Sequence, residues 1–131
     1  MSFVKRTIPF FKYQSPALLW GLFICLILLL PIGDTGTTLL FGFFPVDKLV
    51  HVVLFSFFAL FSRVGWAKWY RNDFFVKKAN TWTVIEGVGL AFLTESLQEL
   101  TFYRTFSFLD IVADIAGISL GLLLFILIYK L

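Results

Sequence analysis

Long apolar runs alternate with short polar stretches along this chain, and four of the runs have the length of a helix. The first, ALLWGLFICLILLL, lies between Pro16 and Pro31. Because proline suits the first turn of a helix and cannot continue a helix past its end, both prolines mark the limits of this run. Each run approaches the roughly 20 residues that a helix needs to cross a bilayer. The predicted helices cover residues 16–32, 46–66, 81–100 and 106–129.

The third predicted helix is the least apolar of the four. It contains Glu86, Glu95, Gln98 and Glu99, so hydropathy alone would miss it. We place Glu86 in its first turn, where a carboxylate is stabilised by the positive end of the helix dipole. The segment before the second helix is predicted to be a loop because it holds three glycines among residues 33–45.

Composition identifies the solvent of this bundle as lipid. Hydrophobic residues make up 60% of the chain and charged residues only 15%, and 18 residues are Phe. A soluble domain of 131 residues has too large a surface relative to its volume to hide that much apolar area. We therefore expect an all-α integral membrane bundle of four transmembrane helices in residues 16–131, preceded by an amphipathic lead at residues 1–15 that lies on the membrane surface.

The basic residues predict the orientation of the bundle. Nine of the eleven lie in the N-terminal lead, the second connection and the C-terminal tail. The positive-inside rule then places both termini in the cytoplasm, in a multi-pass protein of the bacterial cytoplasmic membrane. These basic residues form no single face, which argues against nucleic-acid binding, and the single Cys25 excludes a disulfide framework. The nine are Lys5, Arg6, Lys12, Arg63, Lys68, Arg71, Lys77, Lys78 and Lys130.

This topology brings most of the polar residues of the membrane region to one depth, at the outer end of the bundle. Charge in apolar surroundings is costly and is usually kept for a function. Asp110 and Asp114 are four residues apart and share a helix face, and Gly117 and Gly121 continue that stripe as predicted helix-packing positions. The candidate site comprises Asp47, Lys48, His51, Glu95, Gln98, Arg104, Asp110 and Asp114.

Several roles are open for these groups. Arg104 either binds an anionic lipid phosphate through paired hydrogen bonds or neutralises one of the carboxylates Glu95, Glu99 and Asp110. His51 either donates a hydrogen bond to a carboxylate, shares protons in catalysis, or joins the acids in a divalent metal site. The spacing matches no known metal or catalytic motif, so we assign no metal ligand, no cofactor and no reaction.

Three blocks of the sequence carry a resemblance to a known family, from about Pro45 to the end of the chain. In order, they are Asp47-Lys48 with His51 and Phe55, then Glu95 with Gln98 and Arg104, and finally Asp110 followed by Gly117 and Gly121.

In these blocks the chain resembles the VanZ-like family of small bacterial membrane proteins, named for a teicoplanin-resistance protein. The family pattern commonly has Asn where this chain has Asp114. The resemblance implies a membrane protein linked to glycopeptide tolerance, without implying a reaction. We favour a binding protein whose partners are membrane lipids, a lipid-linked envelope precursor or a lipoglycopeptide, in an oligomeric state that the sequence leaves open. The alternatives are an intramembrane enzyme acting on an envelope lipid or phosphate ester, and a pore or assembly subunit.

Overall fold

The computed structural model describes residues 2–31, 39–40, 42, 44–69, 73–101 and 104–129. Side chains are described for these residues except 2–9, 39–40 and 44. Most of the predicted loop at residues 33–45 therefore lies outside the described residues, as do Arg71 and Lys130 of the basic set.

The described chain is almost entirely helical, which confirms the predicted class. Its helices are α1 (Ser2–Leu29), α2 (Val46–Lys68), α3 (Asp73–Lys77), α4 (Ala79–Glu99) and α5 (Phe108–Tyr129). Between α1 and α2, the two-residue strands β1 (Leu39–Leu40) and β2 (Phe44–Pro45) pair antiparallel, with Leu40 opposite Phe44. The prediction of a loop was wrong for these residues. Gly42 has φ 82°, which glycine adopts without steric cost, and so it can turn the chain between the strands.

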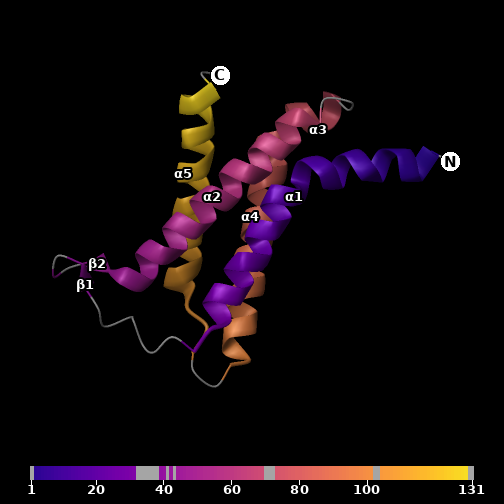
Figure 1. Cartoon of the computed structure of the whole chain (residues 1–131). Coiled ribbons are helices and arrows are strands. Elements are labelled where there is room, and N and C mark those ends of the chain that lie inside the picture. The colour runs from indigo at the N-terminus through magenta and orange to yellow at the C-terminus, as the bar shows by residue number, and fades with distance from the viewer. Residues whose placement is uncertain are drawn as a thin grey trace.

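Four long helices form the bundle, and α2 contacts each of the other three (Figure 1). α1 and α4 also contact each other, and so do α4 and α5. Figure 1 shows the N-terminal part of α1 and the C-terminal end of α5 toward the same end of the bundle, together with α3. The β pair and the start of α5 lie toward the opposite end.

α1 is longer than the sequence predicts, because it continues through Pro16 to Ser2. A proline inside a helix lacks the N–H that would bond the carbonyl four residues back, here Lys12 O. Ser15 Oγ donates to Lys12 O at 3.1 Å and satisfies that carbonyl instead. Such a proline also bends a helix. Figure 1 shows α1 starting across the bundle axis and then turning along it. The position of residues 1–15 on a membrane surface stays a prediction.

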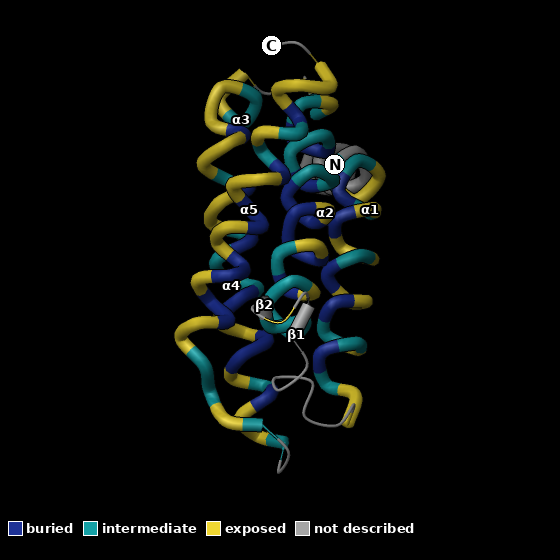
Figure 2. Tube along the Cα trace, turned by 90° about the vertical axis from the view of Figure 1, so that its left-hand side faces the viewer, coloured by how far each residue is buried: buried dark blue, intermediate teal, exposed yellow. Residues whose placement is uncertain are grey.

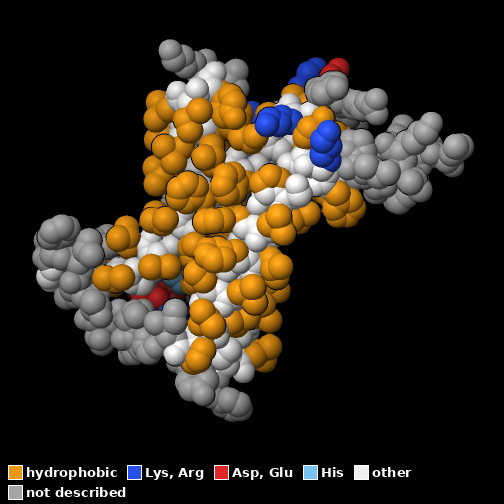
Figure 3. Space-filling model, in the orientation of Figure 1, with side chains coloured by type: hydrophobic (Ala, Val, Ile, Leu, Met, Phe, Trp, Pro, Cys, Tyr) orange, Lys and Arg blue, Asp and Glu red, His pale blue; other side chains and the backbone are white. Residues whose placement is uncertain are grey.

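Three helical segments are long and apolar enough to cross a membrane: 10–29 in α1, 46–68 in α2 and 108–129 in α5. Their buried faces point inward and their exposed faces outward (Figure 2). Many of the exposed side chains are large and apolar, such as Leu19 at 67% and Leu109 at 68%. Hydrophobic atoms accordingly cover most of the described surface on the side seen in Figure 3. A monomeric soluble protein rarely exposes so continuous an apolar surface.

Helices α2 and α5 approach each other closely at two glycines. A Cβ built on Gly117 would lie 2.5 Å from Val52 O, and a Cβ built on Gly121 would lie 2.8 Å from the Ala59 Cβ. Any side chain at these positions would push the two backbones apart. Because α2 and α5 approach this closely, the acids of α5 come within reach of Lys48 and His51 on α2.

Candidate functional site

All eight candidate residues gather at one end of the bundle, where α2 and α5 begin and α4 ends. We call them the polar cluster: Asp47, Lys48, His51, Glu95, Gln98, Arg104, Asp110 and Asp114. The side chains of His51, Glu95 and Asp114 have 0% exposure, and Gln98 and Asp110 are also buried. The buried centre of this end of the bundle is thus polar, while the exposed faces are apolar.

The centre of the polar cluster is a hydrogen bond between His51 on α2 and Asp114 on α5. His51 Nδ1 lies 2.8 Å from Asp114 Oδ1, and neither side chain is exposed. This contact fits the interpretation of His51 as a hydrogen-bond donor to a carboxylate. The carboxylate that the sequence left unassigned is Asp114 on α5.

Two cations connect the remaining aspartates. Lys48 Nζ forms an ion pair with Asp110 Oδ1 and lies 3.7 Å from Asp47 Oδ2. Arg104 lies in the connection between α4 and α5, as predicted, and its Nη2 is 3.1 Å from Asp47 Oδ1. The partner of Arg104 is therefore Asp47, and the alternative in which it neutralises Glu95, Glu99 or Asp110 was wrong as to the acid. The loop carries Arg104 back toward the start of α2.

Glu95 is held from one side by the backbone. The N–H of Ser107 donates to Glu95 Oε2 at 3.0 Å. The Ser107 hydroxyl in turn accepts a hydrogen bond from the Asp110 N–H at 3.3 Å, which caps the start of α5. Sequence reasoning missed Ser107. Its signal was present, because a serine followed three residues later by an acid is typical of a helix start.

Gln98 joins the polar cluster to α1. Its Nε2 donates to the carbonyl of Leu28 at 3.2 Å, in the last turn of α1, where carbonyls lack a partner within the helix. Glu99, the next residue, is exposed. Gln98 therefore holds the end of α4 against the end of α1, and Glu99 lies outside the polar cluster.

Three buried atoms of the polar cluster have no hydrogen-bond partner among the described residues. They are His51 Nε2, Glu95 Oε1 and Asp114 Oδ2. Burying a polar atom without a partner costs about 1–3 kcal/mol, and more for a charged group. One ligand atom from each of these three residues lies within 4.8 Å of the other two, and the same holds for the set Asp47, His51 and Asp110. Both sets combine an imidazole with two carboxylates and could hold a metal ion.

A small cavity gives access to the edge of the polar cluster. Its volume is about 120 Å³, and its lining combines apolar residues of α1 and α2 with Asp47 and Arg104. Acidic side chains are visible in a recess toward the lower end of Figure 3, with hydrophobic atoms beside them. A charged pair therefore lies at the wall of an otherwise apolar cavity.

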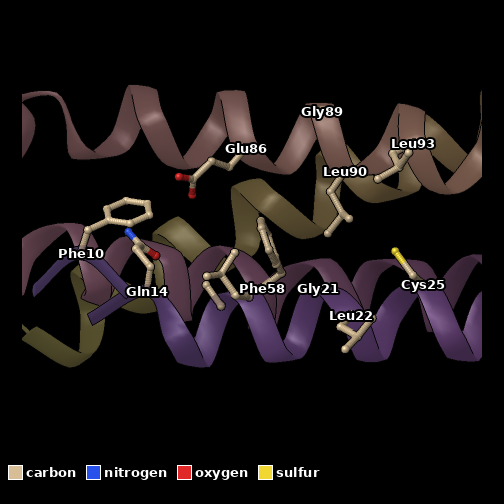
Figure 4. A pocket seen from close by; sticks show the side chains of 12 residues that line it. Phe10, Gln14, Gly21, Leu22, Cys25, Phe58, Glu86, Gly89, Leu90 and Leu93 are labelled. Atoms are coloured by element: carbon tan, nitrogen blue, oxygen red, sulfur yellow. The ribbon is translucent and has the colours of Figure 1, made fainter. Parts of the chain in front are cut away.

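A larger groove of about 410 Å³ lies mainly between α1 and α4 (Figure 4). Glu86 and Gln14 lie near one end of it, and Cys25 and Leu93 near the other. The prediction that Glu86 lies in the first turn of its helix was wrong, because the first turn of α4 (Ala79–Glu99) contains no acid and Glu86 lies further along the helix. Glu86 instead accepts a hydrogen bond from Ser62 Oγ at 2.6 Å.

Comparison with known proteins agrees with this membrane architecture. A search of curated proteins and a search of solved structures each returned no match. The model of the family described as VanZ/LLP1 matches residues 8–129, nearly the whole chain. The match extends the resemblance seen in the sequence to α1, and together with the three apolar helices it identifies a membrane protein. The chain belongs to the VanZ/LLP1 family.

Proposed function

We propose that this protein binds the phosphate headgroup of an envelope lipid at the polar cluster, on the outer side of the bacterial cytoplasmic membrane. The observation that carries the proposal is the Arg104–Asp47 pair at the wall of the small cavity. A guanidinium has five N–H donors in a fixed plane and holds phosphate through two parallel bonds. The contact to Asp47 orients this plane, and the Arg104 side chain is 24% exposed.

In this proposal α4 is the fourth transmembrane helix. Its 21 residues, at roughly 1.5 Å each, give the length of a bilayer core, about 30 Å. Thr83, Thr94 and Glu95 are buried within the bundle, whereas Ile85 and Leu93 are more than half exposed. The charges that lower its mean hydropathy are thus partly hidden, and its outer face suits lipid. This separation supports a spanning helix.

The orientation follows from the basic residues beside α3. Lys68 ends α2, Lys77 ends α3 and Lys78 precedes α4, all at the end of the bundle opposite the polar cluster. With that end in the cytoplasm, both termini are cytoplasmic and the cluster faces outward. In a Cys25→Ala background, a membrane-impermeant maleimide should label Thr105→Cys in intact cells and leave Lys77→Cys unlabelled. The reverse labelling would contradict the outward orientation.

Lipid binding is tested by titrating a polyprenyl phosphate into the purified protein in nanodiscs. Arg104→Ala should weaken binding by about tenfold or more, because a hydrogen bond to a charged group contributes about 1.5–3 kcal/mol. Arg63→Ala is the matched control, since Arg63 is paired with Asn80 at the other end of the bundle. Equal affinities in Arg104→Ala and Arg63→Ala would exclude the phosphate role.

Such binding would allow the protein to protect a lipid-linked precursor from a lipoglycopeptide, and we include teicoplanin tolerance in the proposal. Teicoplanin and vancomycin susceptibility would be measured in a strain without an outer membrane. The wild type should raise teicoplanin tolerance, and Glu95→Gln and Arg104→Ala at matched membrane levels should not. If well-inserted wild-type protein did not change teicoplanin susceptibility, the tolerance role would be excluded. Lipid binding would then be tested by the titration alone.

A second candidate function is hydrolysis of an envelope phosphate ester inside the membrane. The buried His51–Asp114 pair favours it, because a carboxylate that orients an imidazole is a common acid–base arrangement. Turnover of such a lipid by the purified protein, abolished in Asp110→Asn, would support an enzyme. Unchanged turnover in His51→Ala would exclude the acid–base role of this pair.

A further inference from the structure

We propose that His51, Glu95 and Asp114 bind one divalent transition-metal ion between α2, α4 and α5. A candidate ligand atom from each residue lies within 4.8 Å of the other two, and all three side chains have 0% exposure. The residues are far apart in sequence, and only the fold brings them together. The proposal goes beyond lipid binding and stands without it.

The unpaired atoms of this set point to a missing partner. Each of the three residues has one atom held by the protein and one buried atom without a hydrogen bond among the described residues. Glu95 Oε2 is held by Ser107 N–H, and Asp114 Oδ1 by His51. The free atoms are Glu95 Oε1, Asp114 Oδ2 and His51 Nε2. A single cation held by both carboxylates would neutralise the charges that the two free oxygens leave buried without a partner.

The hydrogen bond between His51 and Asp114 marks a place for the ion. An ionised carboxylate only accepts, so Nδ1 of the imidazole donates this bond. Nδ1 and Asp114 Oδ1 are 2.8 Å apart, which is close to the separation of two ligand atoms that each lie about 2.0–2.2 Å from one metal ion. A metal ion would take the place of the proton on Nδ1, and the ring proton would then be on Nε2.

The alternative set, Asp47, His51 and Asp110, is already neutralised by side chains. Lys48 is paired with Asp110 and lies near Asp47, and Arg104 is paired with Asp47. A cation placed there would compete with two fixed positive charges. The set with Glu95 and Asp114 has no Lys or Arg partner among the described contacts, so the metal is favoured there.

The charge balance of the polar cluster also favours a dication. It contains four carboxylates (Asp47, Glu95, Asp110 and Asp114) but only two permanent cations (Lys48 and Arg104). An excess of two negative charges in a low-dielectric region is costly, and a divalent ion removes it. An imidazole with two carboxylates suits Zn²⁺, Mn²⁺ or Fe²⁺ better than Mg²⁺ or Ca²⁺, which prefer oxygen ligands alone.

The experiment uses the full chain in detergent, stripped with EDTA and then titrated with Co²⁺ as a spectroscopic probe. Wild-type protein should show visible ligand-field bands that saturate at one ion per chain, and Zn²⁺ should displace them while Mg²⁺ should not. Protein purified without chelator should contain metal by elemental analysis. The absence of Co²⁺ bands from folded wild-type protein would overturn the proposal, and so would displacement by Mg²⁺ as effective as by Zn²⁺.

Variants assign the ligands. Asp114→Asn and Glu95→Gln keep the shape of each side chain and should each weaken Co²⁺ binding at least tenfold. Glu86→Gln removes a partly buried acid at the other end of α4 and should bind like the wild type. Arg104→Ala should keep the metal while losing lipid phosphate, which separates the two proposals. Co²⁺ affinity in Asp114→Asn and Glu95→Gln equal to that of the wild type would overturn this ligand set.

Discussion

Two regions of the bundle bury polar side chains, and their partners differ. The polar cluster joins α2, α4 and α5 through charged groups, and its Glu95 and Asp114 each keep a buried oxygen unpaired. The second region, which we call the Glu86 network, consists of Gln14, Ser62, Thr83 and Glu86 near the other end of the bundle. There one carboxylate is held mainly by neutral groups. Ser62 Oγ lies 2.6 Å from Glu86 Oε2 and 3.3 Å from Thr83 Oγ1, and Gln14 Nε2 lies 3.5 Å from Ser62 O.

The difference indicates what each region is for. A network of hydroxyls and amides links helices at little electrostatic cost, although such contacts average only about 0.6 kcal/mol in membranes. Several buried carboxylates cost far more to insert, at about 2.5–3.5 kcal/mol each at a helix centre. The Glu86 network is thus typical of a structural contact. The polar cluster costs insertion free energy that a structural role alone does not explain.

The largest effect is expected from Lys48→Ala. It leaves Asp110, whose side chain is 7% exposed, without its cation, and breaking a buried pair on one side costs about 3–5 kcal/mol. The free energy of unfolding would be measured by titrating SDS into dodecylmaltoside micelles. Lys77→Ala is the control, because Lys77 is exposed in α3 and should change stability very little. Equal losses of unfolding free energy in Lys48→Ala and Lys77→Ala would show that the Lys48–Asp110 ion pair does not stabilise the bundle.

A smaller loss is expected from Gly121→Ala, where the added Cβ collides with α2. Overpacking of this kind costs about 1–3 kcal/mol. Gly89→Ala is matched to it, since no atom lies within 4 Å of a Cβ at Gly89 in the middle of α4. That control should hold or gain stability, because alanine favours a helix over glycine. A stable Gly121→Ala protein would show that α2 and α5 are not closely packed.

A loss of about 1 kcal/mol is expected from Ser62→Ala, which removes the hydroxyl that donates to Glu86. The effect should appear in the unfolding titration and leave lipid phosphate and Co²⁺ binding unchanged. Ser119→Ala, at an exposed serine that bonds its own helix, supplies the baseline. Loss of either ligand in Ser62→Ala would contradict the division of the bundle into two regions.

The sequence predicts the fold well where patterns are local. Helices α2, α4 and α5 begin and end within two residues of the predicted limits, because each is bounded by a change from apolar to polar residues. The predicted start of α1 is too late, because Pro16 is typical of the first turn of a helix. Nothing in the sequence pattern shows that Ser15 satisfies the Lys12 carbonyl. Strands β1 and β2 are each two residues long, which is too short to show an alternation of apolar and polar residues in the sequence.

The membership of the polar cluster could be predicted from topology, but its pairings could not. Opposite helix directions bring the start of α2, the end of α4 and the start of α5 to one depth. Which cation meets which acid depends on helix rotation and on a close approach of α2 to α5, and these are tertiary properties. Hence the sequence does not show that Asp47 pairs with Arg104 or that His51 contacts Asp114.

The most direct test of this account is the unfolding free energy of metal-free Glu95→Gln. The amide oxygen can still accept the Ser107 N–H, while the buried charge is gone. If Glu95 is kept for binding, the variant should be as stable as the wild type or more stable, because it removes a buried charge whose desolvation costs on the order of several kcal/mol. A loss of 1 kcal/mol or more would show that the carboxylate holds the bundle together and would contradict the account.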